Sequence, residues 1–303
     1  MLRGAAGQRA EKQGCERNIM RPETNDIRMI ALDLDGTTLA PGGHLADRTK
    51  KALEEALESG IEVVIATGRC FMSVPAEVLG IKGLRYVITS NGAKISDLSE
   101  GGFIYSDCIR ADALHRVMDI LESHRDTYRY ATEVFIDGRA YLDRAVYEDV
   151  MKENTLNRSV DYIRTTRNPV EDVIAFAREH ADNVENISVV FVEESHRQAM
   201  KQPLSSVEGT TFTNSFSYNW ELEGESTDKG NALRWLMKKI GITKEGLMAC
   251  GDSPNDLTMM RLAALPVAVG NAEPEVQAEA VHVAPSNAED GVAQAIERFV
   301  LQR

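Results

Sequence analysis

Short apolar runs recur in two separated stretches of the chain, and segments with helical spacing follow them. In the first stretch the runs cover residues 29–33, 62–67 and 85–89, and in the second they cover 246–251, 265–270 and 280–284. Residues 47–59 place apolar side chains on one helical face before Gly60, a residue type that commonly ends a helix. Apolar runs that alternate with helices are typical of parallel strands buried on both faces. The pattern predicts an α/β fold with a Rossmann-like, doubly wound parallel sheet.

The pattern changes between these two stretches. Residues 111–124, 170–180 and 194–201 have helical spacing, whereas residues 187–192 and the segments TFTNS and NWELE are strand-like. Alternating segments also flank Asp137-Gly138, a dipeptide that favours a hairpin turn over a functional site. These features predict an inserted α+β domain at residues 109–222. The sheet core is then split between residues 27–108 and 223–303.

Residues 1–26 are expected to form a flexible N-terminal tail. They combine four arginines with small and polar residues, and they contain no hydrophobic stretch of signal-peptide length. A transit peptide is the alternative, but Glu11, Glu16 and Glu23 count against it because such peptides contain few acids. Met20 and Met29 are further possible starts, so residues 1–19 need not belong to the native protein.

Composition narrows the range of expected partners. The chain has 303 residues, 43% of them hydrophobic, and 34 basic residues against 47 acidic ones give a formal charge of −13. Neither nucleic acid nor an anionic membrane is expected as a partner, because affinity for both depends largely on Lys and Arg. No apolar run has the length of a membrane span. Nothing in the pattern indicates an oligomeric state.

The cysteines and histidines follow no metal-binding pattern. The cysteines stand at positions 15, 70, 108 and 250, and the six histidines are equally scattered. Neither set matches a zinc site or a small disulfide framework. We therefore expect reduced thiols and a cytoplasmic location.

Polar residues follow four of the predicted strands. They are the candidates for chemistry, because ligands of open α/β sheets bind beyond the carboxyl ends of the strands. The first strand leads into Asp33-Leu34-Asp35-Gly36, where two carboxylates in extended chain point the same way and Gly36 allows a sharp turn. Taken alone, this segment is more often a turn that caps a helix than a site.

The other strand ends carry a hydroxyl, a cation, amides and further acids. They are Thr67-Gly68-Arg69, Ser90-Asn91-Gly92 and the segment GDSPND, which contains Asp252, Asn255 and Asp256. Each segment alone is compatible with a helix cap or a turn. Lys229, which precedes a predicted helix at residues 231–239, is by itself most simply a surface lysine. Together, these residues supply what a hard, oxygen-ligated cation beside a phosphate requires.

The ordered motifs DLDGT, TGR, SNGA, DKG and GDSPND resemble those of the haloacid dehalogenase superfamily of phosphohydrolases. The large insertion between TGR and DKG, with the later GNA (270–272) and DGV (290–292), looks like the Cof-type branch, whose large α/β (class IIB) cap domain occupies that position. The resemblance extends from about residue 27 to the C-terminus. The chain departs from the branch at Thr38, where an apolar residue is more usual, and at Pro254, in a variable part of its motif. We expect Thr38 to alter packing and Pro254 to rigidify its loop.

The resemblance implies a two-step phosphoryl transfer. By position it makes Asp33 the nucleophile that forms an aspartyl-phosphate, and Asp35 the general acid that later acts as base for water. It implies Mg²⁺, held by the side chains of Asp33 and Asp252 and by the backbone carbonyl of Asp35. Asn255 or Asp256 would complete or orient that set of ligands.

The same resemblance implies the residues that bind phosphate. Thr67, the Gly68 N–H and Lys229 would hold the phosphoryl oxygens, with Asn255 beside them. The Lys229 ammonium would also meet Asp33, since one ammonium has three donors.

The implied function is a Mg²⁺-dependent phosphatase that acts on small phosphorylated metabolites, either sugar phosphates or phosphorylated cofactors. The cap would close over the site and supply substrate contacts. In the core, Arg69 and Asn91 are candidate substrate contacts, although Arg69 could instead pair with a nearby acid. A phosphosugar mutase on the same fold is a second hypothesis. A catalytically silent ligand-binding or regulatory protein is a third, and the joint presence of the implied catalytic residues disfavours it.

Overall fold

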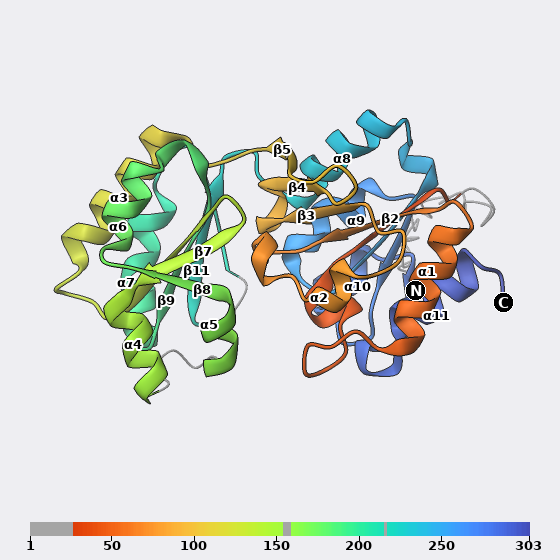
Figure 1. Cartoon of the computed structure of the whole chain (residues 1–303), viewed down its shortest axis with the longest axis horizontal. Coiled ribbons are helices and arrows are strands. Elements are labelled where there is room, and N and C mark those ends of the chain that lie inside the picture. The colour runs from red at the N-terminus through yellow and green to blue at the C-terminus, as the bar shows by residue number, and fades with distance from the viewer. Residues whose placement is uncertain (1–26, 154–158, 215–216) are drawn as a thin grey trace, which may run out of the picture.

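A computed structural model describes residues 27–153, 159–214 and 217–303 of the chain. These residues form two bodies, a core that includes residue 27 and the C-terminus and an inserted unit that we call the cap (Figure 1). The predicted N-terminal tail lies outside the described residues.

The core is built on one eight-stranded sheet with the order β14-β13-β12-β1-β2-β3-β4-β5. Six of its strands are parallel, namely β1 (Met29–Leu32), β2 (Glu62–Ala66), β3 (Tyr86–Thr89), β12 (Leu247–Gly251), β13 (Leu265–Ala268) and β14 (His282–Val283). All six predicted strands are thus confirmed, each shortened by one to three residues. Because β1 lies between β2 and β12, one sheet joins the two separated stretches of sequence.

Two antiparallel strands complete one edge of this sheet. They are β4 (Lys94–Asp97) and β5 (Phe103–Ser106), with a register shift between Ile95 and Ser96. The sequence pattern does not predict them. Each has only four residues, and the segment KISD alternates polar and apolar side chains too briefly to stand out from a loop.

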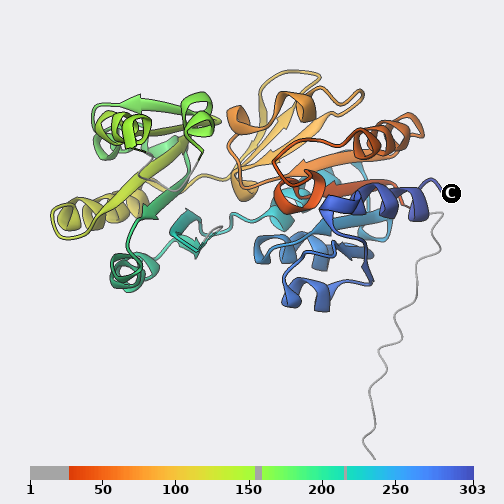
Figure 2. The same cartoon turned by 90° about the horizontal axis from the view of Figure 1, so that it is seen from below.

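Helices cover both faces of the core sheet (Figure 2). Helix α1 (Asp47–Glu58) packs against α11 (Gly291–Phe299), and α8 (Lys229–Ile240) packs against α9 (Leu257–Leu262). The shorter helices are α2 (Ala76–Leu79) and α10 (Pro274–Glu279). Helices on both faces of a mainly parallel sheet confirm the predicted doubly wound architecture.

The cap is built on a six-stranded sheet with the order β10-β11-β9-β6-β7-β8. Strands β6 (Tyr130–Ile136) and β7 (Arg139–Asp143) form the predicted hairpin around Asp137-Gly138. The remaining strands are β8 (Arg167–Val170), β9 (Val184–Phe191), β10 (Thr210–Thr213) and β11 (Asn219–Gly224). Helices α3 (Ala111–His124), α6 (Val173–Glu179) and α7 (Glu194–Ser205) pack on one face of the sheet through a continuous apolar cluster. The inserted α+β architecture is therefore confirmed.

Some cap elements differ from the prediction. The helix predicted over residues 170–180 begins only at Val173, because Arg167–Val170 pairs with β7 as a strand and Asp172 caps the helix by accepting from the N–H groups of Ile174 and Ala175. Helices α4 (Arg144–Glu153) and α5 (Val160–Thr166) are not predicted from the sequence. They pack against the opposite face of the cap sheet from α3, α6 and α7.

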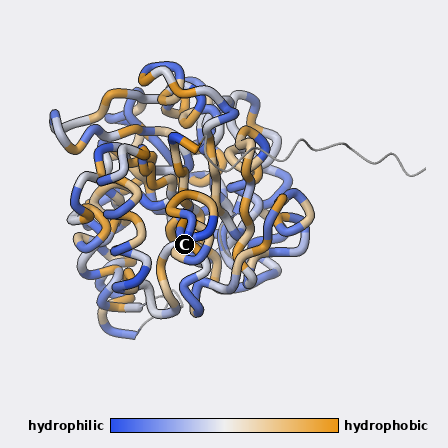
Figure 3. Tube along the Cα trace, turned by 90° about the vertical axis from the view of Figure 1, so that its right-hand side faces the viewer, coloured by the Kyte–Doolittle hydropathy of each residue, from blue (hydrophilic) through white to orange (hydrophobic). Residues whose placement is uncertain are grey.

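Apolar side chains fill the interior of both bodies. In the core, the residues of the parallel strands other than the edge strand β14 are almost all buried, as near-continuous apolar runs predict. Figure 3 shows these apolar positions along the inner strands, with polar positions in the outer loops. In the described part of the chain, no helix combines the length and apolar character that crossing a membrane would require.

Candidate active site

The predicted site residues lie at the carboxyl ends of β1, β2, β3 and β12. After β1 the chain turns at Gly36, which has a φ of +82°. The Thr38 hydroxyl donates to the backbone carbonyl of Asp33 at 2.5 Å, so Thr38 stabilises this turn through a hydrogen bond. An alanine Cβ at Gly36 would lie 2.5 Å from Asp252 Oδ2. Glycine is therefore required both by the backbone angle and by the close approach of the β12 loop.

A buried lysine joins two of the predicted acids. Lys229 Nζ lies 2.6 Å from Asp33 Oδ1 and 2.7 Å from Asp256 Oδ1, and the Lys229 side chain is completely buried. The interpretation of this residue as an isolated surface lysine is therefore wrong. Its ammonium is buried because two carboxylates compensate for the loss of water.

The β12 loop is held by its own side chains and by the turn after β1. Thr37 Oγ1 donates to Asp252 Oδ1 at 2.7 Å, and Ser253 Oγ donates to Asp252 Oδ2 at 3.0 Å. Asp256 Oδ2 accepts from the backbone N–H groups of Asp252 and Ser253. Pro254 begins the short helical turn Pro254–Asp256, where its fixed φ suits a first helical position.

Three carboxylates of this cluster are close enough to share one cation. Oxygens of Asp33, Asp252 and Asp256 all lie within 4.8 Å of one another. Asp33 Oδ2 is buried and has no hydrogen-bond partner in the described part of the chain, an arrangement that costs free energy unless something binds the oxygen. Carboxylate oxygens are the ligands that hard divalent cations prefer. The residues present therefore fit a divalent metal ion.

The pKa values reflect this crowding of acids. Burial, and next the Asp256 carboxylate, raise the pKa of Asp33 well above its usual range. Burial likewise raises the pKa of Asp252. Burial opposes the charge of Lys229, but the carboxylates of Asp256 and Asp33 outweigh it and raise the pKa of the ammonium. A cation bound here would reverse the shifts of the acids, because it favours their ionised forms.

The loops after β2 and β3 meet beside this cluster. Thr67 is buried, and its hydroxyl accepts from the Arg69 N–H at 3.2 Å. A Cβ at Gly68 would lie 2.9 Å from Asn91 Oδ1, and the same Asn91 oxygen accepts from Asn255 Nδ2 at 3.1 Å. The structure thus brings Gly68, Asn91 and Asn255 together. Asn255 Oδ1 is buried without a hydrogen-bond partner among the described residues.

Arg69 pairs with the second acid of the first strand end. Its Nε and Nη2 donate to the two carboxylate oxygens of Asp35 at 2.7 and 2.6 Å, and its Nη1 donates to the Ser73 carbonyl. Its guanidinium also lies 5.6 Å from the centre of the Tyr162 ring in the cap. Of the two roles considered for Arg69, the structure shows the ion pair with an acid.

The cap sheet carries a group of buried polar residues on the face that points away from α3, α6 and α7. These residues are not predicted from the sequence. Strands β6, β9 and β11 turn apolar residues toward the face that α3, α6 and α7 cover, whereas polar residues lie on the other face, beside the apolar patch that packs against α4 and α5. We call these polar residues the polar face: Glu133, Asn186, Ser188, Asn219, Glu221 and Glu223, all buried. The alternation in NWELE is the sequence signal for it.

The cap and core contact each other through this face. Asn91, in the loop after β3, donates from Nδ2 to Glu223 Oε1, and Nδ2 lies 3.4 Å from Glu221 Oε2. Beside it, Glu185 accepts from the Ser90 hydroxyl and from the Gly138 N–H, both at 2.6 Å. These contacts are buried, so the polar face lies directly over the loops that carry the predicted site.

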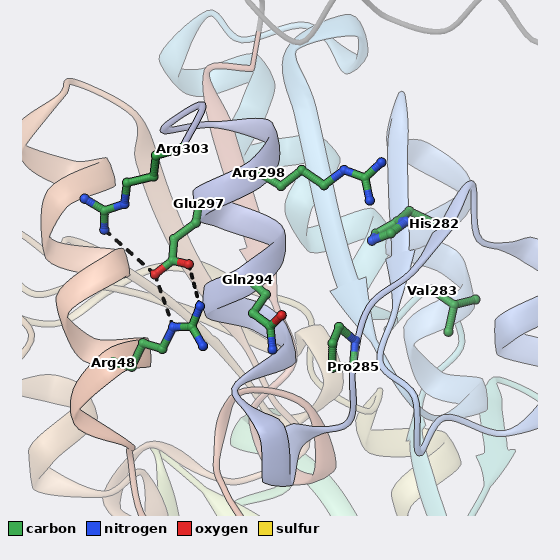
Figure 4. A pocket seen from close by; sticks show the side chains of 8 residues that line it. All are labelled: Arg48, His282, Val283, Pro285, Gln294, Glu297, Arg298 and Arg303. Atoms are coloured by element: carbon green, nitrogen blue, oxygen red, sulfur yellow. Dashed lines mark hydrogen bonds and ion pairs between the residues drawn. The ribbon is translucent and has the colours of Figure 1, made fainter.

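A separate hollow in the core lies between α1, β14 and α11 (Figure 4). Its lining shares no residue with the site described above. Glu297 pairs there with Arg48 at 2.7 Å and with Arg303 at 3.8 Å. These ion pairs connect the C-terminal helix to α1, which is a structural role.

Comparison with known proteins agrees with this fold and site. The family model of the haloacid dehalogenase-like hydrolases matches residues 30–296. The chain is 30% identical to 5-amino-6-(5-phospho-D-ribitylamino)uracil phosphatase YcsE of Bacillus subtilis, over 92% of this chain and 98% of that protein. It is 26% identical to a phosphoglycolate phosphatase of Methanobrevibacter smithii, over 91% of this chain and 100% of that protein. A solved haloacid dehalogenase-like hydrolase from B. subtilis superimposes with a TM-score of 0.75 at 29% identity, covering 90% of this chain and 100% of that one.

A doubly wound core with an inserted α+β cap and an acidic cluster at its strand ends defines a hydrolase of the phosphatase type. The chain belongs to the haloacid dehalogenase-like hydrolase family.

Proposed function

We propose that the chain is a Mg²⁺-dependent phosphatase of small phosphorylated metabolites, either sugar phosphates or phosphorylated cofactors, and that it works through an aspartyl-phosphate. The single observation that carries this is the buried cluster around Asp33, whose Oδ1 is bound by Lys229 while Oδ2 lacks a partner among the described residues. A carboxylate that is fixed through one oxygen and has its second oxygen free is placed to attack phosphorus with that second oxygen.

Two carboxylates divide the chemistry. An Asp33 oxygen attacks the phosphorus atom, the bond from phosphorus to the leaving oxygen breaks, and the Asp35 carboxylic acid gives that oxygen its proton. Asp35, now a carboxylate, takes a proton from water as the water oxygen attacks the phosphorus of the aspartyl-phosphate. This step releases inorganic phosphate and restores the Asp33 carboxylate. General acid and base help of this kind contributes about 10²–10⁴-fold in rate.

The remaining acidic residues would bind the metal ion or orient its ligands. Mg²⁺ would be held by Asp33, Asp252 and the Asp35 carbonyl, and it would supply charge neutralisation at the phosphoryl oxygens. Asp256 accepts from the Lys229 ammonium with one oxygen and from two backbone N–H groups with the other, whereas each oxygen of Asp252 accepts from a single hydroxyl. Asp256 is the more firmly held of the two, so its proposed role is to orient the site rather than to bind the metal ion directly.

The phosphoryl oxygens would be held by donors from three loops. Thr67, the Gly68 N–H and Lys229 supply them, with Asn255 beside them. Such donors stabilise the charge that develops during transfer. Arg69 holds Asp35 through its ion pair, and Asn91 connects the core loops to the cap.

The domain organisation follows from these roles. We assign residues 27–108 with 223–303 to the catalytic core and residues 109–222 to the cap that covers it and excludes water and polymers; strand β11 of the cap sheet runs to Gly224, two residues past that boundary. A cytoplasmic location stays a prediction, and unpaired thiols at Cys70, Cys108 and Cys250 are consistent with it. Neither nucleic acid nor a membrane is proposed as a partner, and the oligomeric state is left open.

The relatives' names suggest the range of substrates. One is named as a phosphatase of 5-amino-6-(5-phospho-D-ribitylamino)uracil, and another is named as a phosphoglycolate phosphatase. Both named substrates are small phosphorylated metabolites, which supports the proposed substrate class.

The test is phosphate release from a panel of phosphorylated metabolites, with Mg²⁺ and with chelator, using Asp33→Asn as the blank. We expect metal-dependent release that is absent in the variant. Wild-type turnover in Asp33→Asn would refute the assignment of the nucleophile. An isomerised sugar phosphate without free phosphate would instead identify a mutase, and the absence of any reaction would favour a binding protein.

A further inference from the structure

The turn that follows β3 has a strained backbone. Ser90 and Asn91 both lie in the left-handed region, with φ angles of +49° and +52°. Among residues other than glycine, asparagine adopts this region more readily than serine, so the strain is greater at Ser90. Such a conformation persists only where the surrounding structure holds it. Because Ser90 is completely buried, its contacts show what holds the turn.

Within the core, this turn contacts two of the loops that carry donors of the proposed phosphate site. The Asn91 N–H donates to the Thr67 carbonyl at 3.1 Å, and Asn91 Oδ1 accepts from Asn255 Nδ2 at 3.1 Å. A Cβ at Gly68 would lie 2.9 Å from the same Asn91 oxygen. The places of Asn255 and of the Gly68 backbone therefore depend on the conformation of the turn.

On the cap side, Glu185 of β9 contacts the same turn. Its side chain is buried, and its two carboxylate oxygens accept from the Ser90 hydroxyl and from the Gly138 N–H, each at 2.6 Å. Gly138 lies at the tip of the β6–β7 hairpin, and its carbonyl accepts from the Met72 N–H of the core at 2.8 Å. A Cβ at Gly138 would lie 2.9 Å from Phe103 Cζ. Glu185 thus joins the strained turn to a hairpin tip that is packed closely against the core.

The hydrogen bond from Ser90 to Glu185 can offset the strain of the turn. Both side chains are buried, and their O···O distance of 2.6 Å is that of a strong, charge-assisted bond. Because both Glu185 oxygens accept, the carboxylate form is the one that makes both bonds. Without the docked cap, water takes the place of Glu185, and a hydroxyl bonded to water restrains the backbone less.

We propose that Glu185 is a positioning residue that holds the strained Ser90–Asn91 turn, so that docking of the cap completes the phosphate site of the core. Asn255 and the Gly68 backbone then reach their binding positions together with the cap. By linkage, bound phosphate favours the docked cap by the same factor. This inference rests on the proposed phosphatase function, because it concerns how the phosphate site of that function is formed.

The test compares two substitutions of Ser90 by calorimetric titration with inorganic phosphate in millimolar Mg²⁺. Ser90→Ala removes the hydroxyl and keeps the strain, whereas Ser90→Gly removes both. We expect phosphate binding to weaken about tenfold in Ser90→Ala, or ~1.4 kcal/mol, and less than about threefold in Ser90→Gly. Both variants lose the same hydrogen bond to Glu185, so a merely structural bond would not separate them.

An amide cannot replace the Glu185 carboxylate, because it offers one acceptor oxygen and one N–H₂ group. Glu185→Gln should therefore weaken phosphate binding about tenfold. In Ser90→Gly/Glu185→Gln, the affinity should return to within about threefold of the wild type, since glycine needs no partner to hold a positive φ. The matched control is Glu208→Gln, an exposed cap glutamate, which should bind phosphate as the wild type does. If Glu185→Gln does not fold, the two Ser90 variants decide.

Amide hydrogen exchange reports on the docking of the cap itself. The Met72 N–H donates to the cap, at the Gly138 carbonyl, so it should exchange when the cap undocks. Phosphate with Mg²⁺ should slow this exchange in the wild type, and it should slow it less in Ser90→Ala. An exchange rate of Met72 that phosphate leaves unchanged in the wild type would overturn the coupling.

The outcomes separate this inference from the function beneath it. If the wild type does not hydrolyse p-nitrophenyl phosphate with Mg²⁺, the phosphatase proposal fails and the inference fails with it. If hydrolysis occurs, equal phosphate affinity in Ser90→Ala and Ser90→Gly overturns only the positioning role of Glu185. Wild-type affinity in Glu185→Gln, or no recovery in the double variant, overturns that role as well.

Discussion

The buried ammonium of Lys229 offers a sharp test of the site because its loss should be measurable without any substrate. Its Nζ contacts Asp33 at 2.6 Å and Asp256 at 2.7 Å, and the side chain has no exposed surface. Lys229→Met preserves the apolar stem but leaves two buried carboxylates uncompensated. Removing one partner of a buried ion pair costs about 3–5 kcal/mol. At about 2–4 °C per kcal/mol for a protein unit of this size, the melting temperature should fall by roughly 6–20 °C.

The assay is thermal unfolding followed by circular dichroism at pH 7, with chelator present so that no metal ion replaces the ammonium. The matched control is Lys238→Met on the same helix, where the side chain is exposed and surface substitutions change stability by about 0.5 kcal/mol or less. Adding Asp33→Asn to Lys229→Met should restore part of the lost stability, because it removes one of the two orphaned charges. A melting temperature for Lys229→Met within 2 °C of the control, ~1 kcal/mol or less by the same scale, would refute the reasoning.

Three further predictions concern residues around this cluster. Burial raises the pKa of Glu223 from 4.5 to about 8, so the folded state binds this proton more tightly than the unfolded state, and stability falls as the pH rises from about 4.5 to about 8. Glu223→Gln should therefore flatten the pH dependence of the melting temperature. Identical pH profiles for the variant and the wild type would contradict this. Arg69→Ala should release Asp35 and slow the hydrolysis of alkyl phosphates about tenfold or more. The hydrolysis of p-nitrophenyl phosphate should be slowed less, because its leaving group needs little protonation. Equal losses of rate for the two substrates would argue against Arg69 as a residue that positions the acid. Gly36→Ala should lower the free energy of unfolding by about 1–3 kcal/mol, because alanine is strained at the positive φ of this position. The added methyl group should also displace Asp252 and so raise the Mg²⁺ concentration needed for half-maximal activity. An unchanged Mg²⁺ requirement would count against Asp252 as a ligand.

The core could be predicted because its strands are buried on both faces. A strand such as β2, Glu62–Ala66, has no polar side to present, so its apolar run is visible in the sequence alone. The edge strands β4 and β5 could not be recognised in this way. Lys94 illustrates the reason: it is 5% exposed, yet its ammonium donates to Ser106 and lies over the Phe103 ring, and both partners come from the neighbouring strand.

The acidic cluster at the strand ends was partly predictable for a different reason. Parallel strands bring their carboxyl ends to one edge, so the motifs around Asp33 and Asp252 were expected to meet there even though they are far apart in sequence. The burial of Lys229 was not predictable from local pattern, because it depends on both carboxylates being present. The ion pair between Arg69 and Asp35 likewise depends on how the turn after β1 faces the loop after β2.

The polar face was missed because alternation in a strand does not say what covers its polar side. In NWELE, Glu221 and Glu223 were as compatible with solvent as with a partner surface. Only the docking of the cap on the core buries Glu221 and Glu223 against Asn91. Local pattern does not reveal the burial of these residues, because the contact that buries them is made between the cap and the core.

Charge balance predicts that a divalent cation and a phosphate ester bind together at this site. The cluster at the strand ends contains four carboxylates, on Asp33, Asp35, Asp252 and Asp256, against the two cations Lys229 and Arg69. A phosphate monoester brings further negative charge, so it should bind well only together with a divalent cation, and by linkage each should tighten the other. Calorimetric titration with inorganic phosphate should therefore give at least about tenfold weaker binding in chelator than in millimolar Mg²⁺, or ~1.4 kcal/mol of coupling. Equal affinity under both conditions would mean that Lys229 and the loop N–H groups suffice to hold the phosphate, and that the acids serve another purpose.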